Sequence, residues 1–279
     1  MNQPFSPSHD FSHTEMKLDG FQVIREQDTQ VIEEWLSRGK HIDEPVERDY
    51  TWLMLACYEQ NRFMIEFVMN HHPDVGVTTQ NGQNALGMLC GDFARSDLSD
   101  VALMLIEKGI DLHGVNQSGY TPLMWGGNRG HRNIVKLLIK QGASVHIIDK
   151  EGKNALILAT MAQDDEVVQS LIQAGSELNQ VDHEGKNALM HSIECGPKVA
   201  CAKLLIQAGA EVNGQDKKGM TPLMWAVLKN KPELVKGLFE SGAKLDLKNK
   251  NGQIASDLIQ GDRQPEIVEL FRVYQEKKY

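Results

Sequence analysis

The sequence predicts an all-α repeat solenoid, in which helix–turn–helix units stack in one direction and β-turn or hairpin loops join them. Two glycine series and one recurring triplet predict this fold class. The first series has intervals of 37, 33, 33, 34 and 33 residues, at Gly82, Gly119, Gly152, Gly185, Gly219 and Gly252. The second has intervals of 33, 33, 34 and 33 residues, at Gly109, Gly142, Gly175, Gly209 and Gly242. A Thr-Pro-Leu or Asn-Ala-Leu triplet follows five of the six glycines of the first series. Self-similarity at one period of this length is the signature of a repeat architecture.

The stretch 116–148 is the clearest copy of the unit. Gly119 suits a turn that needs positive φ. Thr121 is placed to cap the first helix, and Pro122 takes the first helical position, where no amide donor is lost. Gly142 stands where the second helix ends, a position that favours a left-handed cap. The same outline returns at 216–248.

These residues resemble the ankyrin repeat, whose 33-residue unit is a β-turn followed by two antiparallel helices with a Thr-Pro-Leu-His-x-Ala core. The sequence departs from this core in the same way in both Thr-Pro-Leu units. Met124 and Met224 replace the histidine and keep an apolar side chain at its position. The resemblance covers about residues 18–276, strongly over 78–252 and weakly at both ends. It implies about eight units, including degenerate terminal caps.

The chain divides accordingly into a mobile polar leader, one repeat domain and a short tail. The leader is 1–17, the domain is 18–276, and the tail is 277–279. The predicted units are 18–46, 47–77, 78–115, 116–148, 149–181, 182–215, 216–248 and 249–276. The first and last lack the Thr-Pro start and fit terminal caps, which cover the end of the apolar stack with a polar exterior.

Three of the predicted units are irregular. In 47–77, Trp52 stands where proline usually sits, and His71-His72-Pro73 replaces the terminal glycine. In 78–115, four extra residues fall within 91–100, between the two helices. They form either a longer surface turn or a binding insertion, since insertions in repeat arrays map to loops on one face. The unit 182–215 has one extra residue near Gly196-Pro197.

Composition predicts a soluble cytoplasmic protein. Hydrophobic residues are 41% and charged residues 24% of the chain, as in globular proteins. No apolar run approaches 18 residues, so no membrane span is expected, and the start lacks the basic and apolar regions of a secretory signal. Cys57, Cys90, Cys195 and Cys201 have no ligand partners at zinc spacing and are interpreted as reduced structural thiols. Cys57 and Cys90 occupy the small-residue slot of a first helix.

No catalytic, cofactor or metal site is predicted, and an enzyme is not expected. The sequence has no Gly-x-x-x-x-Gly-Lys-Ser/Thr phosphate loop, no Gly-x-Ser-x-Gly elbow and no His-Glu-x-x-His. His71 and His72 are adjacent and would point apart on a helix. Each unit of a solenoid contacts only its neighbours, so no deep enclosed pocket is expected for acid–base chemistry.

The resemblance implies that the turn tips and the exposed side of the first helices form a concave surface for protein recognition. Two positions per unit supply the candidates: the residue after each turn glycine and a pair near the end of each first helix. The predicted partner-binding residues are Tyr50, Tyr58, Gln83, Asp92, Tyr120, Asn128, Arg129, Lys153, Met161, Lys186, Glu194, Met220, Leu228 and Lys229. Tyrosine and arginine side chains often contribute most of the binding energy at protein interfaces. The alternative is that some of them pack between neighbouring first helices. Trp125 and Trp225 are expected in the core.

Charge constrains the partner. The net charge is −9, and residues 1–48 and 149–213 each carry 10 acidic against 5 basic side chains, whereas 214–279 carry 12 basic against 9 acidic. An acidic body argues against nucleic-acid binding, which needs a concentrated positive surface. It would steer a protein with a basic patch toward the array, although it also serves solubility.

The sequence therefore predicts a non-enzymatic adaptor or scaffold that binds another protein through the concave face and needs no cofactor. The alternative is an inhibitor or immunity protein that neutralises a toxin or hydrolase by direct binding. Two capped ends favour a monomer.

Overall fold

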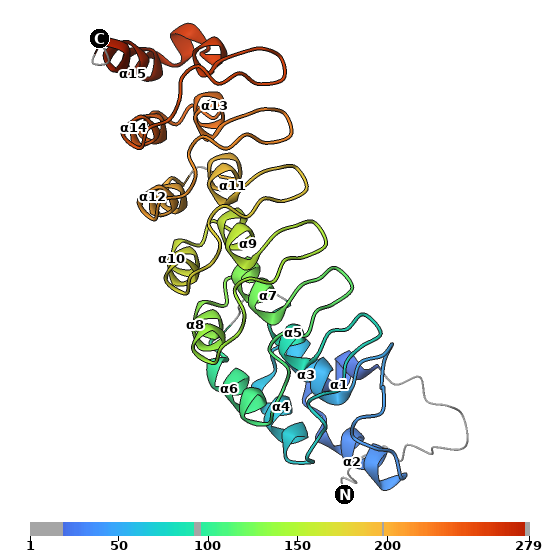
Figure 1. Cartoon of the computed structure of the whole chain (residues 1–279). Coiled ribbons are helices and arrows are strands. Elements are labelled where there is room, and N and C mark those ends of the chain that lie inside the picture. Colours follow the sequence, from blue (N-terminus) through green and yellow to red (C-terminus); the bar gives the residue numbers. More distant parts are fainter. Residues whose placement is uncertain (1–18, 92–95, 197, 277–279) are drawn as a thin grey trace, which may run out of the picture.

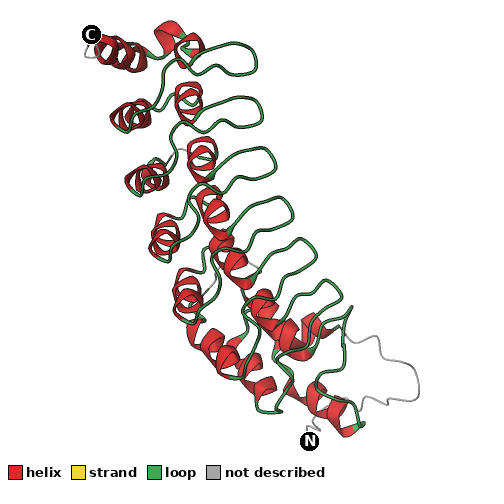
Figure 2. Ribbon diagram, viewed as in Figure 1, coloured by secondary structure: helices red, strands yellow, loops and turns green. Residues whose placement is uncertain are grey.

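The computed structural model describes residues 19–91, 96–196 and 198–276, which form helices joined by loops and turns. The predicted leader 1–17, the tail 277–279 and Asp92 lie outside these residues. Within them there is no strand (Figure 2), and β-type pairing is confined to isolated bridges between Glu47 and Tyr50 and between Ile148 and Asn154. Figure 1 shows a curved stack, with the first helices and the loops on its inner side and the second helices on its outer side. The predicted all-α repeat solenoid is confirmed.

Helices follow one another in pairs along the chain. Their bounds are α1 Gly20–Glu26, α2 Thr29–Ser37, α3 Trp52–Tyr58, α4 Arg62–Met69, α5 Ala85–Leu89, α6 Ser99–Glu107, α7 Pro122–Arg129, α8 Arg132–Lys140, α9 Ala155–Met161, α10 Asp165–Gln173, α11 Ala188–Glu194, α12 Ala200–Gln207, α13 Pro222–Leu228, α14 Pro232–Glu240, the 3₁₀ helices η1 Ala255–Leu258 and η2 Gly261–Arg263, and α15 Pro265–Glu276. From α3 to α11, each first helix packs on its partner and on the first helix of the next pair, as α9 does on α10 and α11.

The first helices begin where the sequence predicts. The Thr121 and Thr221 hydroxyls accept hydrogen bonds from the amides of Met124 and Met224, and proline follows each threonine at the first helical position. In the Asn-Ala-Leu triplets the asparagine is the cap. Asn154 accepts from the Ile157 amide through its side-chain oxygen and donates to the Glu177 carbonyl through its nitrogen. One side chain thus caps the helix and also holds the loop that leaves the second helix.

The second helices end in left-handed residues. Gly109, Gly142, Gly175, Gly209 and Gly242 have φ between +80° and +88°. His72 adopts φ +54° at the corresponding place in the unit that lacks the glycine. A histidine can hold this conformation, although it is strained for a residue with a Cβ.

The core is a continuous apolar stripe between the two rows of helices. Met124 and Met224 are buried, as expected of apolar fillers, and Trp52 is fully buried at the start of α3. Cys57 and Cys90 are also fully buried on α3 and just after α5. Helices of seven to nine residues are marginal alone, so their stability comes from this packing.

The C-terminal end departs from the regular pattern. The 3₁₀ turns η1 and η2 stand where a first helix would be, and α15 then packs on α14. Phe239 on α14 packs edge-on against Phe271 at 5.0 Å and stacks on Tyr274 at 4.3 Å between ring centroids. The buried amide of Gln264 donates to the Val227 carbonyl, which closes the end of α13. These contacts cover the last apolar surface of the stack.

Candidate functional site

The turn loops are the most regular part of the inner side, and we call the segments 79–83, 116–120, 149–153, 182–186, 216–220 and 249–253 the fingers. In the last five, an Asn or Asp at the first position bends the loop. Its side-chain oxygen accepts hydrogen bonds from the amides two and four residues later, as Asp149 does from Glu151 and Lys153, both at 2.8 Å. Such local bonds fix the direction of the residue after each turn glycine.

One backbone hydrogen bond joins each finger to the next. The Gln117 amide donates to the Asn81 carbonyl at 2.7 Å and the Lys150 amide to the Ser118 carbonyl at 2.9 Å. The same bond recurs from His183 to Glu151, from Lys217 to Glu184 and from Lys250 to Lys218, at 2.8 to 2.9 Å. The fingers therefore hold the side chains between them at fixed spacing. We define the concave face as the fingers together with the exposed side of the first helices.

The structure places most of the predicted partner-binding residues on this face, with differing exposure. Exposed members are Tyr58, Leu228 and Lys229, and half-buried members are Tyr50, Gln83, Tyr120, Asn128, Arg129, Lys153, Met161 and Glu194. Lys186 and Met220 are both only 6% exposed, so the expectation that they face outward is wrong for these two. Asp92 lies outside the described residues.

Lys186 is buried because residues of its own and the next predicted unit surround it. Its Nζ contacts Glu184 at 2.9 Å and Glu194 at 2.6 Å, and it lies 5.0 Å from the ring centroid of Trp225. The pKa of Lys186 is raised: burial lowers it, but the two carboxylates outweigh that cost. Met220 is covered similarly, with the Asn249 amide 3.6 Å from its sulfur.

An aromatic cluster forms the centre of the face. The ring centroids of Tyr120 and Trp125 are 4.8 Å apart, and the Arg129 guanidinium lies 5.5 Å from the Trp125 centroid. Trp125 packs against the core as expected but is only half-buried, and its ring lies beside Tyr120 on the concave face. Trp225 is 8% exposed and is a core residue as predicted. A flat ring system flanked by a cation is a favourable anchor for a protein partner.

Beneath the fingers, the side chain at the first position of a finger is hydrogen-bonded in two units to the side chain nine residues later. Asp182 Oδ2 lies 2.7 Å from His191 Nε2, and Asp216 Oδ2 accepts from Trp225 Nε1 at 3.1 Å. Leucine occupies the corresponding place after Asp149, so Asp149 Oδ2 is buried without a hydrogen-bond donor among the described residues. The sequence reasoning missed these pairs, although aligning the units at their period shows the acids and their partners in register.

The pKa of Asp182 is lowered. Burial acts to raise it, but the amides of Lys186 and Glu184 and the His191 ring all donate to the carboxylate and outweigh burial. Asp182 therefore remains an anion at neutral pH, which stabilises a donor on the facing nitrogen of His191.

Two hollows lie near these residues. One, of about 460 Å³, is on the concave face and is lined by Glu151, Lys153, Met161, Asp182, His183, Glu184, Lys186, His191, Glu194 and Cys195. Cys195 lines it as an exposed free thiol, whereas Cys57, Cys90 and Cys201 are buried. All four cysteines are free thiols, as predicted, and Cys195 differs from the other three because it is exposed.

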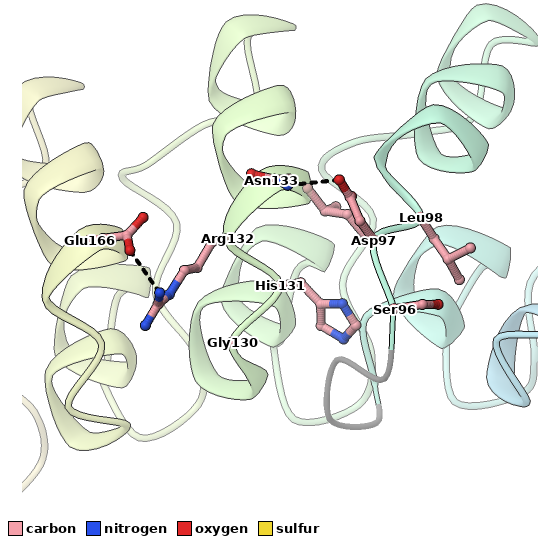
Figure 3. A pocket seen from close by; sticks show the side chains of 9 residues that line it. Ser96, Asp97, Leu98, Gly130, His131, Arg132, Asn133 and Glu166 are labelled. Carbon is pink, nitrogen blue, oxygen red and sulfur yellow. Dashed lines mark hydrogen bonds and ion pairs between the residues drawn. The ribbon is translucent and has the colours of Figure 1, made fainter.

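The other hollow, of about 400 Å³, lies at the start of α8, beside the predicted insertion at 91–100 (Figure 3). Its charged groups are paired: Arg132 contacts Glu166 at 2.7 Å, and Asn133 donates to Asp97 at 2.7 Å. The pKa of Asp97 is lowered by its hydrogen bonds with Ser99 and Asn133. This arrangement orders the end of a loop, and residues 92–95 of the insertion lie outside the described residues.

The described residues contain no group of three or more His, Cys, Asp or Glu side chains arranged to hold a metal ion. Among the described helices, none is both long and apolar enough to cross a membrane.

Comparison with known proteins agrees with the fold described above. A family model described as ankyrin repeats (3 copies) matches residues 93–182 and 158–249. The ankyrin repeat domain of Bcl-3, a member of the IkappaB protein family, is 22% identical with a TM-score of 0.66, and the match covers 80% of this chain and all of that domain. The human ASB11 ankyrin repeat domain is also 22% identical, with a TM-score of 0.69 and coverage of 78% and 97%. At this identity the likeness shows the fold. Comparison of the sequence with curated proteins gave no match.

Proposed function

This chain belongs to the ankyrin repeat family, and we propose that it is a non-enzymatic adaptor or scaffold that recognises a partner protein through its concave face. Ankyrin repeat domains generally mediate contacts between proteins. The observation that supports this role here is the cluster of Tyr120, Trp125 and Arg129 on a row of hydrogen-bonded fingers. Side chains held in place before binding lose little conformational entropy when a partner arrives.

The proposed surface extends to both sides of this cluster. Tyr58 is 37% exposed at the end of α3, and Leu228 is 38% exposed at the end of α13. Tyr58 is itself supported by Phe21, whose ring centroid lies 5.6 Å away. Large exposed side chains spread along one face suit a partner that contacts several units at once. Energetic dominance by a few aromatic and arginine residues is typical of such interfaces.

The test is affinity purification of binding proteins with three forms of the full chain. The face variant carries Tyr120→Ala, Arg129→Ala and Leu228→Ala. The control variant carries Phe63→Ala and Val268→Ala, which are 50% and 44% exposed on α4 and α15, in the outer row of helices. We expect a partner that the wild type and the control capture and the face variant does not. Equal capture by the face variant, with an unchanged melting temperature, would place the binding surface elsewhere.

We also propose that the partner has a basic patch. The chain has a net charge of −9 and carries its acidic excess in 1–48 and 149–213. Attraction of this kind speeds association and weakens as salt screens it. The association rate should therefore fall clearly between low and physiological salt while the dissociation rate changes little. A rate that is independent of salt would argue against a basic partner.

Inhibition of a toxin or hydrolase by direct binding is the second candidate, and the acidic charge favours it because a basic enzyme would be attracted. Stoichiometric loss of activity of a captured enzyme would support inhibition, and full activity in the complex would support scaffolding. We further propose that the protein acts as a monomer in the cytoplasm. Light scattering and cell fractionation test these two points.

A further inference from the structure

Cys195 differs from the other three cysteines in its surroundings. It follows α11 directly and lines the hollow of the concave face, whereas Cys57, Cys90 and Cys201 are buried. Burial raises the pKa of Cys201 to about 11 and that of Cys90 to about 12, so these thiols stay protonated and shielded. A reagent in solution therefore meets one thiol on the folded chain.

His191 and Asp182 stand behind this thiol in line. Asp182 Oδ2 is 2.7 Å from His191 Nε2, and His191 Nδ1 is 4.0 Å from Cys195 Sγ, at the outer limit of a hydrogen bond to sulfur. Because the ionised Asp182 accepts the proton on Nε2, the tautomer it favours has the lone pair of Nδ1 facing the thiol. Nucleophile, base and orienting carboxylate thus follow one another as they do in covalent catalysis. Such contacts are often loose until a reactant is bound.

The arrangement is particular to this unit. In the preceding unit the residues that correspond to His191 and Cys195 are Leu158 and Ala162, and in the following unit they are Trp225 and Lys229. The repeat scaffold therefore does not require this set of side chains.

Charged side chains of both signs surround the thiol. The pKa of Cys195 is raised, by burial first and then by Glu194, while Lys186, Lys229 and Lys153 act to lower it. The thiol is consequently protonated at neutral pH and needs a base to react. The lysines do not leave a net positive charge, because Lys186 is paired with Glu184 and Glu194, and Lys153 is paired with Glu151.

We propose that Cys195 is a modification site that undergoes thiol–disulfide exchange with small disulfides. His191 Nδ1 takes the thiol proton, and the sulfur attacks one sulfur of the disulfide. The disulfide bond breaks, and the departing thiolate takes the proton from His191. Protein thiol and disulfide thus give a protein mixed disulfide and one free thiol, and excess thiol reverses the step. The attached group lies in the hollow with Lys153, Met161 and Glu194, on the proposed partner surface.

The test uses the folded full chain and Ellman's reagent, a dianionic aromatic disulfide, and needs no binding partner. We expect one rapidly reacting thiol per chain, absent from Cys195→Ser, with the other three reacting only after unfolding. His191→Gln should slow the reaction at neutral pH at least about tenfold, since a positioned base contributes factors of 10² or more. The matched control is His183→Gln, a histidine that lines the same hollow. A rate for His191→Gln equal to that of the control would overturn the role of His191.

The pH profile separates a base from a structural residue. His191→Gln should lose rate most at neutral pH and should approach the wild-type rate at the higher pH at which the thiol ionises without a base. Asp182→Asn should give an intermediate rate with unchanged circular dichroism, because Asp182 is a positioning residue. A rapidly reacting native thiol other than Cys195 would overturn the site.

Discussion

Replacing Gly119 by alanine tests whether contact between fingers holds the array together. Gly119 has φ +83°, and a Cβ there would lie 2.9 Å from the Cα of Asp149 and 3.0 Å from the amide nitrogen of Lys150. The left-handed conformation costs an L-residue about 1–2 kcal/mol. The atoms in the way belong to the backbone of the next finger, and overpacking of this kind costs a further ~1–3 kcal/mol. We therefore expect Gly119→Ala to lower the free energy of unfolding by roughly 2–5 kcal/mol in total.

Gly142→Ala is the matched control. Its φ is +85°, but no atom lies within 4 Å of the added Cβ, so only the conformational cost of about 1–2 kcal/mol applies. Urea unfolding of both variants, followed by circular dichroism, measures the difference. Equal slopes with denaturant would show that the unfolding transition is comparable in the two proteins. Equal losses of stability in Gly119→Ala and Gly142→Ala would refute the reasoning, because neighbouring fingers would then accommodate the added Cβ with no loss of stability.

Three further changes test the polar contacts. The buried Trp125 Nε1 has no acceptor among the described residues, whereas Trp225 Nε1 donates to Asp216. Asn116→Asp would supply the equivalent acceptor and should raise the free energy of unfolding in urea by about 1 kcal/mol. In a Trp125→Phe background no gain should remain. Thr221→Ala removes the cap of α13 and should cost about 0.5–2 kcal/mol in the same assay, whereas no loss would deny the cap its role. The pKa of Asp182 is lowered on folding, so its contribution to stability is present above the unfolded pKa of about 4 and is lost as the pH falls through the folded pKa. The melting temperature of Asp182→Asn should therefore fall less steeply with acid than that of the wild type. An unchanged dependence of the melting temperature on pH would contradict this.

Much of the fold could be predicted because its determinants are local. Thr121 caps a helix through an amide three residues away, and Pro122 needs only its own fixed φ to start one. The period then repeats these local choices along the chain. The glycine that ends a second helix has the same origin, and His72 shows that the left-handed position is kept even where the glycine is absent.

Exposure on the concave face could not be predicted in the same way, because it depends on the next unit. Lys153 and Lys186 occupy the same position after a turn glycine, yet Lys153 is half-buried and Lys186 is buried. Lys186 contacts Trp225 on α13, the first helix of the next unit, and Glu184 and Glu194 enclose its ammonium. The position of a residue in the repeat determines where its Cα lies, and contacts with the neighbouring units determine how much of its side chain is exposed to a partner.

The same dependence explains why chemistry arises at one unit alone. A finger acid must be neutralised or hydrogen-bonded once burial removes it from water. Trp225 meets this need for Asp216 with the only N–H of its indole, whereas His191 meets it for Asp182 and keeps a second nitrogen that faces Cys195. A structural requirement of the fold therefore places an oriented imidazole beside an exposed thiol. Reactivity at Cys195 follows from satisfying a buried carboxylate with the one side chain that has two opposed nitrogens.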